Sequence, residues 1–343
     1  MDATPAAPGT LLTALGPLAA LYDDPAVSSI MVDAPDRVYV ERSVDHVTRL
    51  EEVPAPFTGP DDVRAVIDAV LAAAGRPLAQ GQLVAEARLA DDSRFLAVLP
   101  PAAVAGPCFV LRSTRPWREH PIEWENLLDL GSVTQEALDL LRSAVQAQIN
   151  LLIAGGTASG KTTLANRVAE LIAPDRRLVV IEAAVELYIR HPRTVRLTAE
   201  DADGVSYAGL LHTASCLRPD WLIIGELTGP AALVAMQILG HGHTGLTTIH
   251  ATGTENALAR IESYCLMANL GLGLGDIRNI VASALRLIIF HERLPTGRRR
   301  ITEIVELAGL EHDRYVLRPL MRCDAESGRL VATGARPGWE AQG

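Results

Sequence analysis

Lysine is almost absent from the chain, although arginine is frequent. Among 31 basic residues Lys161 is the one lysine, and all the others are arginines. An ammonium group and a planar guanidinium fork bind anions in different ways. The retention of a single lysine therefore indicates that position 161 needs an ammonium group.

Cysteine is scarce as well. The chain has four cysteines without C-x-x-C spacing, at positions Cys108, Cys216, Cys265 and Cys323. This scatter argues against zinc modules and against a disulfide framework, and it fits a reducing compartment.

Long apolar runs and an excess of positive charge are also missing. No run of 18 apolar residues occurs, so we expect no transmembrane helix. No basic residue precedes Arg37, so we expect no signal peptide. The formal net charge of −10 disfavours nucleic acid as the main partner, because phosphate backbones bind basic surfaces. An acidic membrane contact through a few arginines stays compatible with this charge.

The remaining composition, 48% apolar and 21% charged residues, is typical of a globular protein. A length of 343 residues predicts one large domain or two ordinary ones. Sequence patterns predict an α+β domain over residues 1–112, a linker over 113–131 and an α/β domain over 132–343. The expected helices cover residues 11–21, 61–74, 134–148, 164–172, 256–268 and 276–287. Strands are expected within 28–41 and 83–99, at 108–112, 151–154, 177–181, 222–224 and 247–249, and in hairpins joining 288–291 to 301–307 and 315–318 to 329–333.

The most informative stretch is GGTASGKTT, a glycine-rich loop between the apolar residues 151–154 and a helix-like segment. It matches the P-loop pattern G-x-x-x-x-G-K-[ST] in a strand–loop–helix context. Loop N–H groups and the helix N-terminus attract phosphate, Lys161 would reach the β- and γ-phosphates, and the Thr162 hydroxyl would ligate Mg²⁺. The alternative is a glycine-rich turn without a ligand. We predict a nucleotide site made of Gly155, Gly156, Thr157, Ala158, Ser159, Gly160, Lys161, Thr162 and Thr163.

Strands that alternate with helical stretches predict a parallel, doubly wound sheet. Ligands bind such sheets at the carboxyl ends of the strands. Four candidate residues directly follow predicted strands and are expected to meet at one edge: Thr157, Glu182, Glu226 and His250.

Each polar candidate has an alternative interpretation. Glu226 ends an apolar strand, as the glutamate that binds Mg²⁺ or polarises water does in NTPases, but it is also compatible with a surface glutamate. Glu182 and Glu186 could orient water or begin a helix. The histidines His241, His243 and His250 lie within ten residues. They fit a loop that contacts the γ-phosphate or a neighbouring subunit better than a zinc site, because cysteine and carboxylate partners are missing.

Isolated arginines on strands, such as Arg94 and Arg112, are by default solvated. The run Arg298–Arg300 is interpreted as a solvated hairpin tip.

The order of motifs resembles the traffic ATPases of type II and type IV secretion and of type IV pilus assembly. The motifs are GGTASGKTT, IEAAVEL, LRPDWLIIGEL and GHGHTGLTTIHA followed by ALARIE, which match Walker A, Asp box, Walker B and His box. SSIMVDAPDRVYVER and ARLADDSRFLAVLPP, with GPCFVLR, resemble the N-terminal domain of the conjugation and tight-adherence pilus branch.

The resemblance implies a RecA-type ATPase core after a smaller N-terminal domain, with ATP bound between the two. It implies a cytoplasmic homo-hexamer that docks on inner-membrane platform proteins and uses ATP and Mg²⁺. Lys161 and Thr162 would take the phosphates and Mg²⁺, Glu226 and Glu182 would be catalytic, and Glu226 would also serve the metal. The resemblance assigns phosphate or nucleotide contacts to His243, His250, Arg94, Arg112 and Arg260.

The chain departs from the family pattern at three positions, of which the first two bear on turnover and coupling. Ala183 stands in place of the Asp-box aspartate, and Thr228 in place of an arginine that commonly follows the Walker B glutamate. Ala158 replaces a common loop glycine, which costs little where φ is negative. The resemblance predicts an ATP-driven motor. The rivals are a scaffold that binds ATP but hydrolyses it poorly, and a nucleic-acid-stimulated NTPase, which the charge disfavours.

Overall fold

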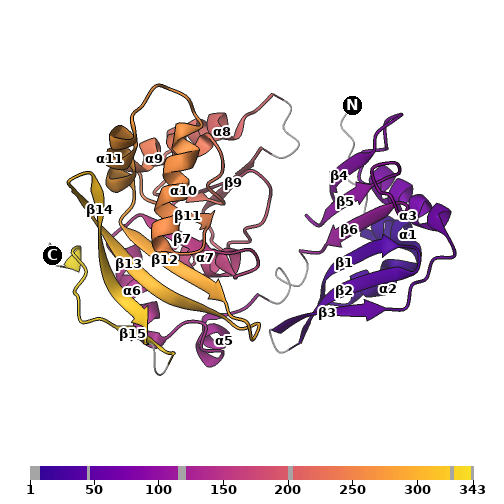
Figure 1. The fold of residues 1–343 in the computed structure, drawn as a ribbon, viewed down its shortest axis with the longest axis horizontal. Helices are drawn as coiled ribbons and strands as arrows, with labels where there is room; N and C mark the ends of the chain where they lie inside the picture. Colours follow the sequence, from indigo (N-terminus) through magenta and orange to yellow (C-terminus); the bar gives the residue numbers. More distant parts are fainter. Residues whose placement is uncertain (1–7, 45–46, 115–120, 200–203, 325–327, 341–343) are drawn as a thin grey trace. The chain divides into compact units, whose positions relative to one another are not determined.

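A computed structural model describes residues 8–44, 47–114, 121–199, 204–324 and 328–340. The chain divides into two compact units, residues 1–121 and 122–343. Figure 1 shows the ribbon of both, coloured along the sequence. Among the described residues, no helix combines the length and apolar character needed to cross a membrane.

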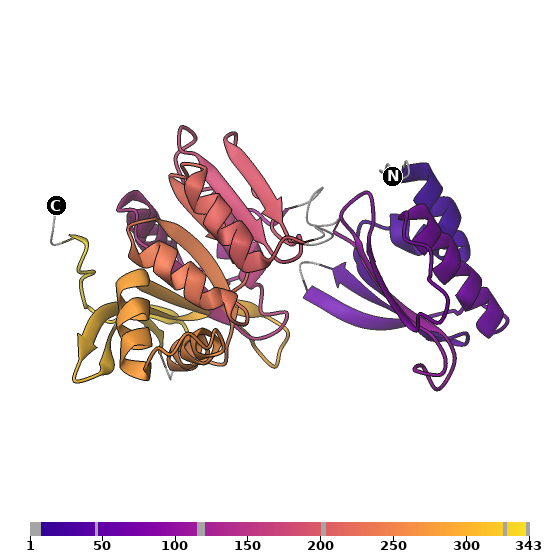
Figure 2. The same cartoon turned by 90° about the horizontal axis from the view of Figure 1, so that it is seen from above.

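The first unit is a six-stranded antiparallel sheet in the order β3-β2-β1-β6-β5-β4. Its helices cover one face of the sheet (Figure 2). Leu15, Ile67 and Phe95 belong to the shared core of this unit. The elements are α1 (Pro8–Leu15), η1 (Gly16–Leu18), α2 (Ala19–Asp23), β1 (Val27–Ala34), β2 (Arg37–Val44), β3 (Val47–Val53), α3 (Pro60–Ala73), β4 (Val84–Arg88), β5 (Arg94–Val98) and β6 (Cys108–Arg112).

The second unit is a nine-stranded sheet in the order β15-β14-β13-β12-β7-β11-β10-β8-β9. The strands from β12 to β9 pair in parallel, and β13, β14 and β15 extend the sheet as antiparallel hairpins. The predicted parallel α/β core after a smaller α+β domain is confirmed. The strands are β7 (Leu151–Gly155), β8 (Leu178–Glu182), β9 (Thr194–Thr198), β10 (Trp221–Ile224), β11 (Gly245–His250), β12 (Leu287–Arg293), β13 (Arg299–Glu311), β14 (Arg314–Cys323) and β15 (Leu330–Ala332).

Helices cover both faces of this second sheet. Leu151 and Ile153 of β7 pack in one core with α5, α6 and α7, whereas Leu152 and Ala154 pack in the other with the remaining helices. Burial on both faces explains why β7 is an uninterrupted apolar run. The helices are α5 (Trp124–Asp129), α6 (Gln135–Gln146), α7 (Lys161–Ala169), α8 (Tyr207–Cys216), α9 (Ala231–Gly240), α10 (Thr254–Leu266) and α11 (Leu274–Ala284).

The structure differs from the sequence-based expectations at several elements. Residues 122–131, expected in the linker, belong to the second unit, because α5 buries Leu127 in its core. The edge strands β3 and β9 were missed, and so were α8 and α9. The residues of β9 are exposed or half-buried, and its alternation is short, with Val195 and Leu197 as its two apolar residues. The strand expected at 288–291 pairs with β7 as well as with β13.

Candidate active site

The candidate loop follows β7, which lies between β11 and β12. Gly160 turns the chain into α7 with a φ of +100°, in the left-handed region that favours glycine. Gly155 is required for a different reason. A Cβ atom there would lie 2.1 Å from the main-chain oxygen of His291. One glycine therefore makes the turn, and the other allows β12 to pack closely against the loop.

Ala158 does not meet the condition under which it would cost little. Its φ is +56°, in the left-handed region, where an L-residue with a side chain is disfavoured by about 1–2 kcal/mol. The loop therefore stores strain at this position, and contacts around it must hold it in place.

The loop and the start of α7 fit a phosphate group. The N–H of Leu164 is the first to follow the helical pattern, donating to the carbonyl of Gly160 at 3.0 Å, so the preceding N–H groups have no helical acceptor. Such N–H groups bind anions. The Ser159 hydroxyl is buried and has no hydrogen-bond partner in the described part of the chain. Thr162 and Thr163 are half-buried in the first turn, where the Thr162 hydroxyl suits Mg²⁺.

The ammonium of Lys161 connects the loop to two other strand ends. Nζ donates to the carbonyl oxygens of Gly155 at 3.0 Å and Gly156 at 2.8 Å. It also lies 3.1 Å from Nδ1 of His250. Because an ammonium only donates, Nδ1 accepts, and the proton of the neutral imidazole is on Nε2. Nε2 lies 3.5 Å from Oε2 of Glu226. The side chains of Lys161, His250 and Glu226 thus form a continuous series of polar contacts, called here the line from Lys161 to Glu226.

Burial shifts the pKa of each of these three side chains in the direction that favours its neutral form. It lowers the pKa of Lys161, against the opposing charges of Glu226 and Glu186. It raises the pKa of Glu226, and the charge of Lys161 opposes that shift. It lowers the pKa of His250, and the charges of Lys161 and Arg260 add to this effect. His250 is therefore neutral near pH 7, as the tautomer assignment requires.

Glu182 is held in a different way. Its side chain is 2% exposed, and Oε1 accepts the N–H groups of Glu186 at 2.8 Å and Leu187 at 2.7 Å. Oε2 lies 3.2 Å from Nη2 of Arg196. A Cβ at Gly225 would lie 2.9 Å from Cγ of Glu182. These contacts make Glu182 the organiser of the loop after β8, and its expected catalytic role stays a prediction.

His243 is not brought to the P-loop of its own chain. The parallel register sets His250 beside Gly155 and Leu246 beside Leu151. His243 precedes β11, so it lies at the edge of the sheet opposite to the P-loop. One strand length therefore separates His243 from His250 and from the P-loop of the same chain, and the nucleotide contact expected for His243 stays a prediction.

Arg260 lies on the exposed side of α10. Its Nη2 donates to the hydroxyl of Tyr264 at 2.8 Å, and its guanidinium lies 5.6 Å from the centre of that ring. Its charge acts on both Glu226 and His250. This places Arg260 within electrostatic reach of the line, and its nucleotide contact stays a prediction.

Comparison with known proteins shows the family of the chain. The model of the type II/IV secretion system protein family matches residues 12–313. The chain belongs to this family. Conjugal transfer protein TrbB of Rhizobium radiobacter is 33% identical, over 87% of this chain and 89% of that protein. Type IV secretion system protein VirB11 of Bartonella quintana is 26% identical, over 86% and 92%. In fold, the chain resembles the ATPase DotB of Legionella pneumophila, with a TM-score of 0.56 and 18% identity over 91% of this chain and 84% of that chain.

The resemblance inferred from the four motifs is therefore confirmed. Family membership together with an intact P-loop makes the chain an ATPase of the type II/IV secretion family.

In the first unit of this secretion ATPase, arginines form a row across three strands. Arg94 lies directly opposite Arg112 on one side and opposite Arg88 on the other. Sequence patterns missed Arg88, because its place in the row depends on strand pairing. Opposed like charges destabilise a sheet, and carboxylates offset part of this cost: Glu86 lies 2.6 Å from Arg94, and Asp92 pairs with Arg88. The phosphate contacts of Arg94 and Arg112 stay a prediction.

Two residues of the β12–β13 hairpin contact the P-loop, and sequence reasoning missed both. Nδ1 of His291 lies 2.5 Å from the carbonyl oxygen of Ser159. Nε of Arg299 donates to the carbonyl oxygen of Ala158 at 2.8 Å. The interpretation of residues 298–300 as a solvated tip is therefore wrong for Arg299. No local pattern marks either residue, because the hairpin is far from the loop in sequence.

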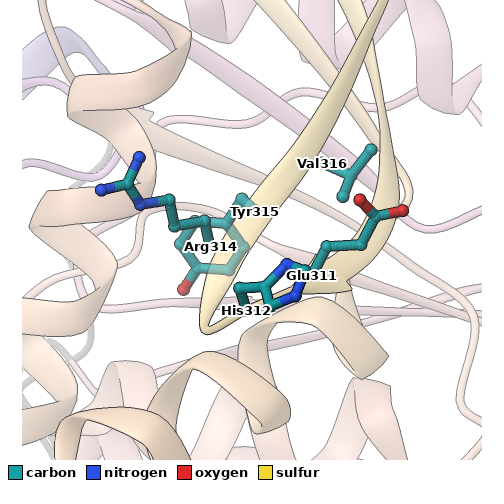
Figure 3. A pocket seen from close by; sticks show the side chains of 5 residues that line it. All are labelled: Glu311, His312, Arg314, Tyr315 and Val316. Atoms are coloured by element: carbon teal, nitrogen blue, oxygen red, sulfur yellow. The ribbon is translucent and has the colours of Figure 1, made fainter.

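A surface pocket of about 590 Å³ lies at the turn between β13 and β14 (Figure 3). Arg299, at the other end of β13, is the residue that contacts the P-loop, so the pocket lies at the far end of this strand. None of the predicted site residues lines it, and the P-loop remains the candidate active site. The pocket is lined by Glu311, His312, Arg314, Tyr315 and Val316.

Proposed function

We propose that this secretion ATPase hydrolyses ATP at its P-loop with Mg²⁺ and thereby powers a secretion, conjugation or pilus-assembly machine. The observation that carries the proposal is the line from Lys161 through His250 to Glu226. It joins a phosphate-binding ammonium to a carboxylate that can orient an attacking water. The names of the similar proteins, which include conjugal transfer and type IV secretion proteins, support this setting.

The side chains suggest a division of roles. Phosphate oxygens are charged and accept more strongly than carbonyls, so Lys161 exchanges its carbonyl and imidazole partners for ATP. His250 then loses the donor on Nδ1, and this couples the imidazole to nucleotide binding. Glu226, whose pKa is raised by burial, orients the water and accepts its proton. The Thr162 hydroxyl would hold Mg²⁺, which would neutralise charge at the phosphate oxygens.

The assembly we propose is a homo-hexamer at the cytoplasmic face of the inner membrane, docked on platform proteins. The resemblance of all four motifs to the traffic ATPases supports the ring. The net charge of −10 supports protein partners over nucleic acid.

The test is steady-state phosphate release by the full chain with Mg-ATP, with particle mass measured in the same buffer. Lys161→Ala and Glu226→Gln are each expected to lower turnover at least about 100-fold. Glu255→Gln, at an exposed glutamate in the first turn of α10, is the matched control and keeps full turnover. Equal turnover in Glu226→Gln and Glu255→Gln would remove Glu226 from the mechanism.

One observation favours a second candidate, a scaffold that binds ATP and assembles without efficient hydrolysis. The carboxylate of Glu182 is occupied by two main-chain N–H groups and Arg196, and Ala183 offers no second carboxylate next to it. Tight ATP binding and ring formation without phosphate release, also after addition of membrane partners, would establish the scaffold instead of the motor.

A further inference from the structure

Strand β12 brings a buried histidine against the P-loop. β12 pairs in parallel with β7 as far as Phe290 beside Ala154, and its register with β13 shifts between Phe290 and His291. Irregularities of this kind re-aim side chains next to functional sites. The ring of His291 is 3% exposed and close to the loop, since a Cβ at Gly160 would lie 3.0 Å from its Cε1.

The hydrogen bonds of His291 define where its proton lies. Nδ1 is 2.5 Å from the carbonyl oxygen of Ser159, and Nε2 is 3.4 Å from the hydroxyl of Ser132. A carbonyl only accepts, so Nδ1 carries the proton and Nε2 accepts from the hydroxyl. Burial lowers the pKa of His291 to about 4, which keeps the ring neutral near pH 7. Its one N–H is therefore directed at the P-loop.

Arg299 holds the neighbouring carbonyl of the loop. Its Nε donates to the carbonyl oxygen of Ala158 at 2.8 Å, and a Cβ at Gly160 would lie 3.3 Å from its Cδ. Ala158 has a φ of +56°, a conformation that alanine rarely adopts. A strained residue persists where its surroundings hold it, and Arg299 supplies such a contact.

These two contacts also orient loop N–H groups. In a trans peptide the C=O and N–H bonds point in opposite directions, and the peptide plane is rigid. A donor that holds the carbonyl of Ser159 on the hairpin side therefore turns the N–H of Gly160 away from the hairpin. Arg299 holds the carbonyl of Ala158, and the N–H of the same peptide, that of Ser159, donates to the carbonyl oxygen of Gly156 at 3.3 Å and closes a turn within the loop. The N–H of Gly160 thus adds to the N–H groups of the first turn of α7, and N–H groups gathered in this way make an anion-binding concavity.

We propose that His291 and Arg299 are positioning residues that hold the P-loop in its phosphate-binding shape, an inference that rests on the proposed nucleotide site. Each acts through a main-chain carbonyl of the loop. The loss of either contact is expected to loosen the loop and weaken phosphate binding, while the line from Lys161 to Glu226 remains present.

The experiment measures the dissociation constant of Mg-ATP by calorimetry on the full chain. His291→Leu and Arg299→Ala each remove one donor to the loop and are expected to weaken binding about tenfold. His291→Asn keeps an N–H near the position of Nδ1 and is expected to restore most of the affinity. Arg300→Ala is the matched control on β13, because its guanidinium donates to the carbonyl of Gly328 and not to the loop.

Hydrogen–deuterium exchange over residues 156–163 gives a second readout that does not depend on nucleotide. Both donor-removing variants are expected to exchange faster there, and Arg300→Ala is not. Wild-type affinity and wild-type loop exchange in both variants would overturn the proposal. Failure of the wild type to bind ATP would instead refute the nucleotide site, and the exchange data would still decide the positioning role. Arg299 is half-buried, so its variant keeps the test valid if His291→Leu does not fold.

Discussion

Acidification from pH 7 to pH 5 is expected to destabilise the second unit through His291. This histidine is 3% exposed and its pKa is lowered from the usual 6.5 to about 4, mainly by burial. Outside the loop, Nε2 of His291 lies 3.4 Å from the Ser132 hydroxyl, and the positive charges of Arg299 and Lys161 further oppose protonation of the ring. The folded unit therefore accommodates the neutral imidazole and opposes its protonation.

The direction and the size of this pH effect on the free energy of unfolding follow from proton linkage. Between pH 6.5 and 4 the unfolded chain binds a proton at this side chain that the folded chain does not, so stability rises with pH in that window. The contribution of His291 is complete above pH 6.5 and is lost as the pH falls toward 4. Integration of the two titrations from pH 7 to 5 gives a loss of about 2 kcal/mol in the free energy of unfolding.

The assay is urea unfolding at both pH values, followed by tryptophan fluorescence, since three of the four tryptophans, Trp124, Trp221 and Trp339, lie in the second unit. With a slope of about 2 kcal/mol per molar urea, the loss corresponds to a midpoint shift of about 1 M. His291→Asn cannot titrate there and is expected to lack this part of the shift, while all other groups titrate as in the wild type. An equal pH difference in both proteins would refute the reasoning.

Three further predictions concern stability. Gly155→Ala places a Cβ 2.1 Å from a main-chain oxygen of β12, and urea unfolding is expected to show a loss of about 3 kcal/mol in the free energy of unfolding. Gly156→Ala is the neutral control, because no atom lies within 4 Å of the added Cβ. Glu306→Ala removes a fully buried carboxylate 2.8 Å from Arg286 and is expected to lower the free energy of unfolding by about 3–5 kcal/mol. The variant is also expected to speed proteolysis of residues 333–340, and unchanged protection of this segment would contradict the prediction. Thr134→Ala removes the N-cap hydroxyl that accepts the N–H of Ala137 in the first turn of α6, and calorimetry is expected to show a loss of about 1 kcal/mol.

Much of the site could be predicted because its signals are local or follow from strand direction. The P-loop needs consecutive residues only: Gly160 adopts positive φ, and Lys161 starts the helix. Glu226 and His250 could be placed beside the loop because parallel strands end at one edge, and the structure brings Lys161, His250 and Glu226 into one line. The same rule places His243, which precedes its strand, at the other edge of the sheet, although the motif alone had grouped it with His250.

Contacts between distant segments were beyond the sequence patterns. His291 lies 132 residues after Ser159 and Arg299 lies 141 residues after Ala158, and both reach the loop only because β12 pairs with β7. Likewise, sequence patterns did not show that Arg196 and two main-chain N–H groups bind the carboxylate of Glu182, whose catalytic role stays a prediction. Backbone conformation and strand direction are encoded over a few residues, so the chain alone specified the P-loop and its edge of the sheet. The contacts of His291 and Arg299 with the carbonyls of that loop depend on strand pairing across more than a hundred residues. Only the folded structure decides them.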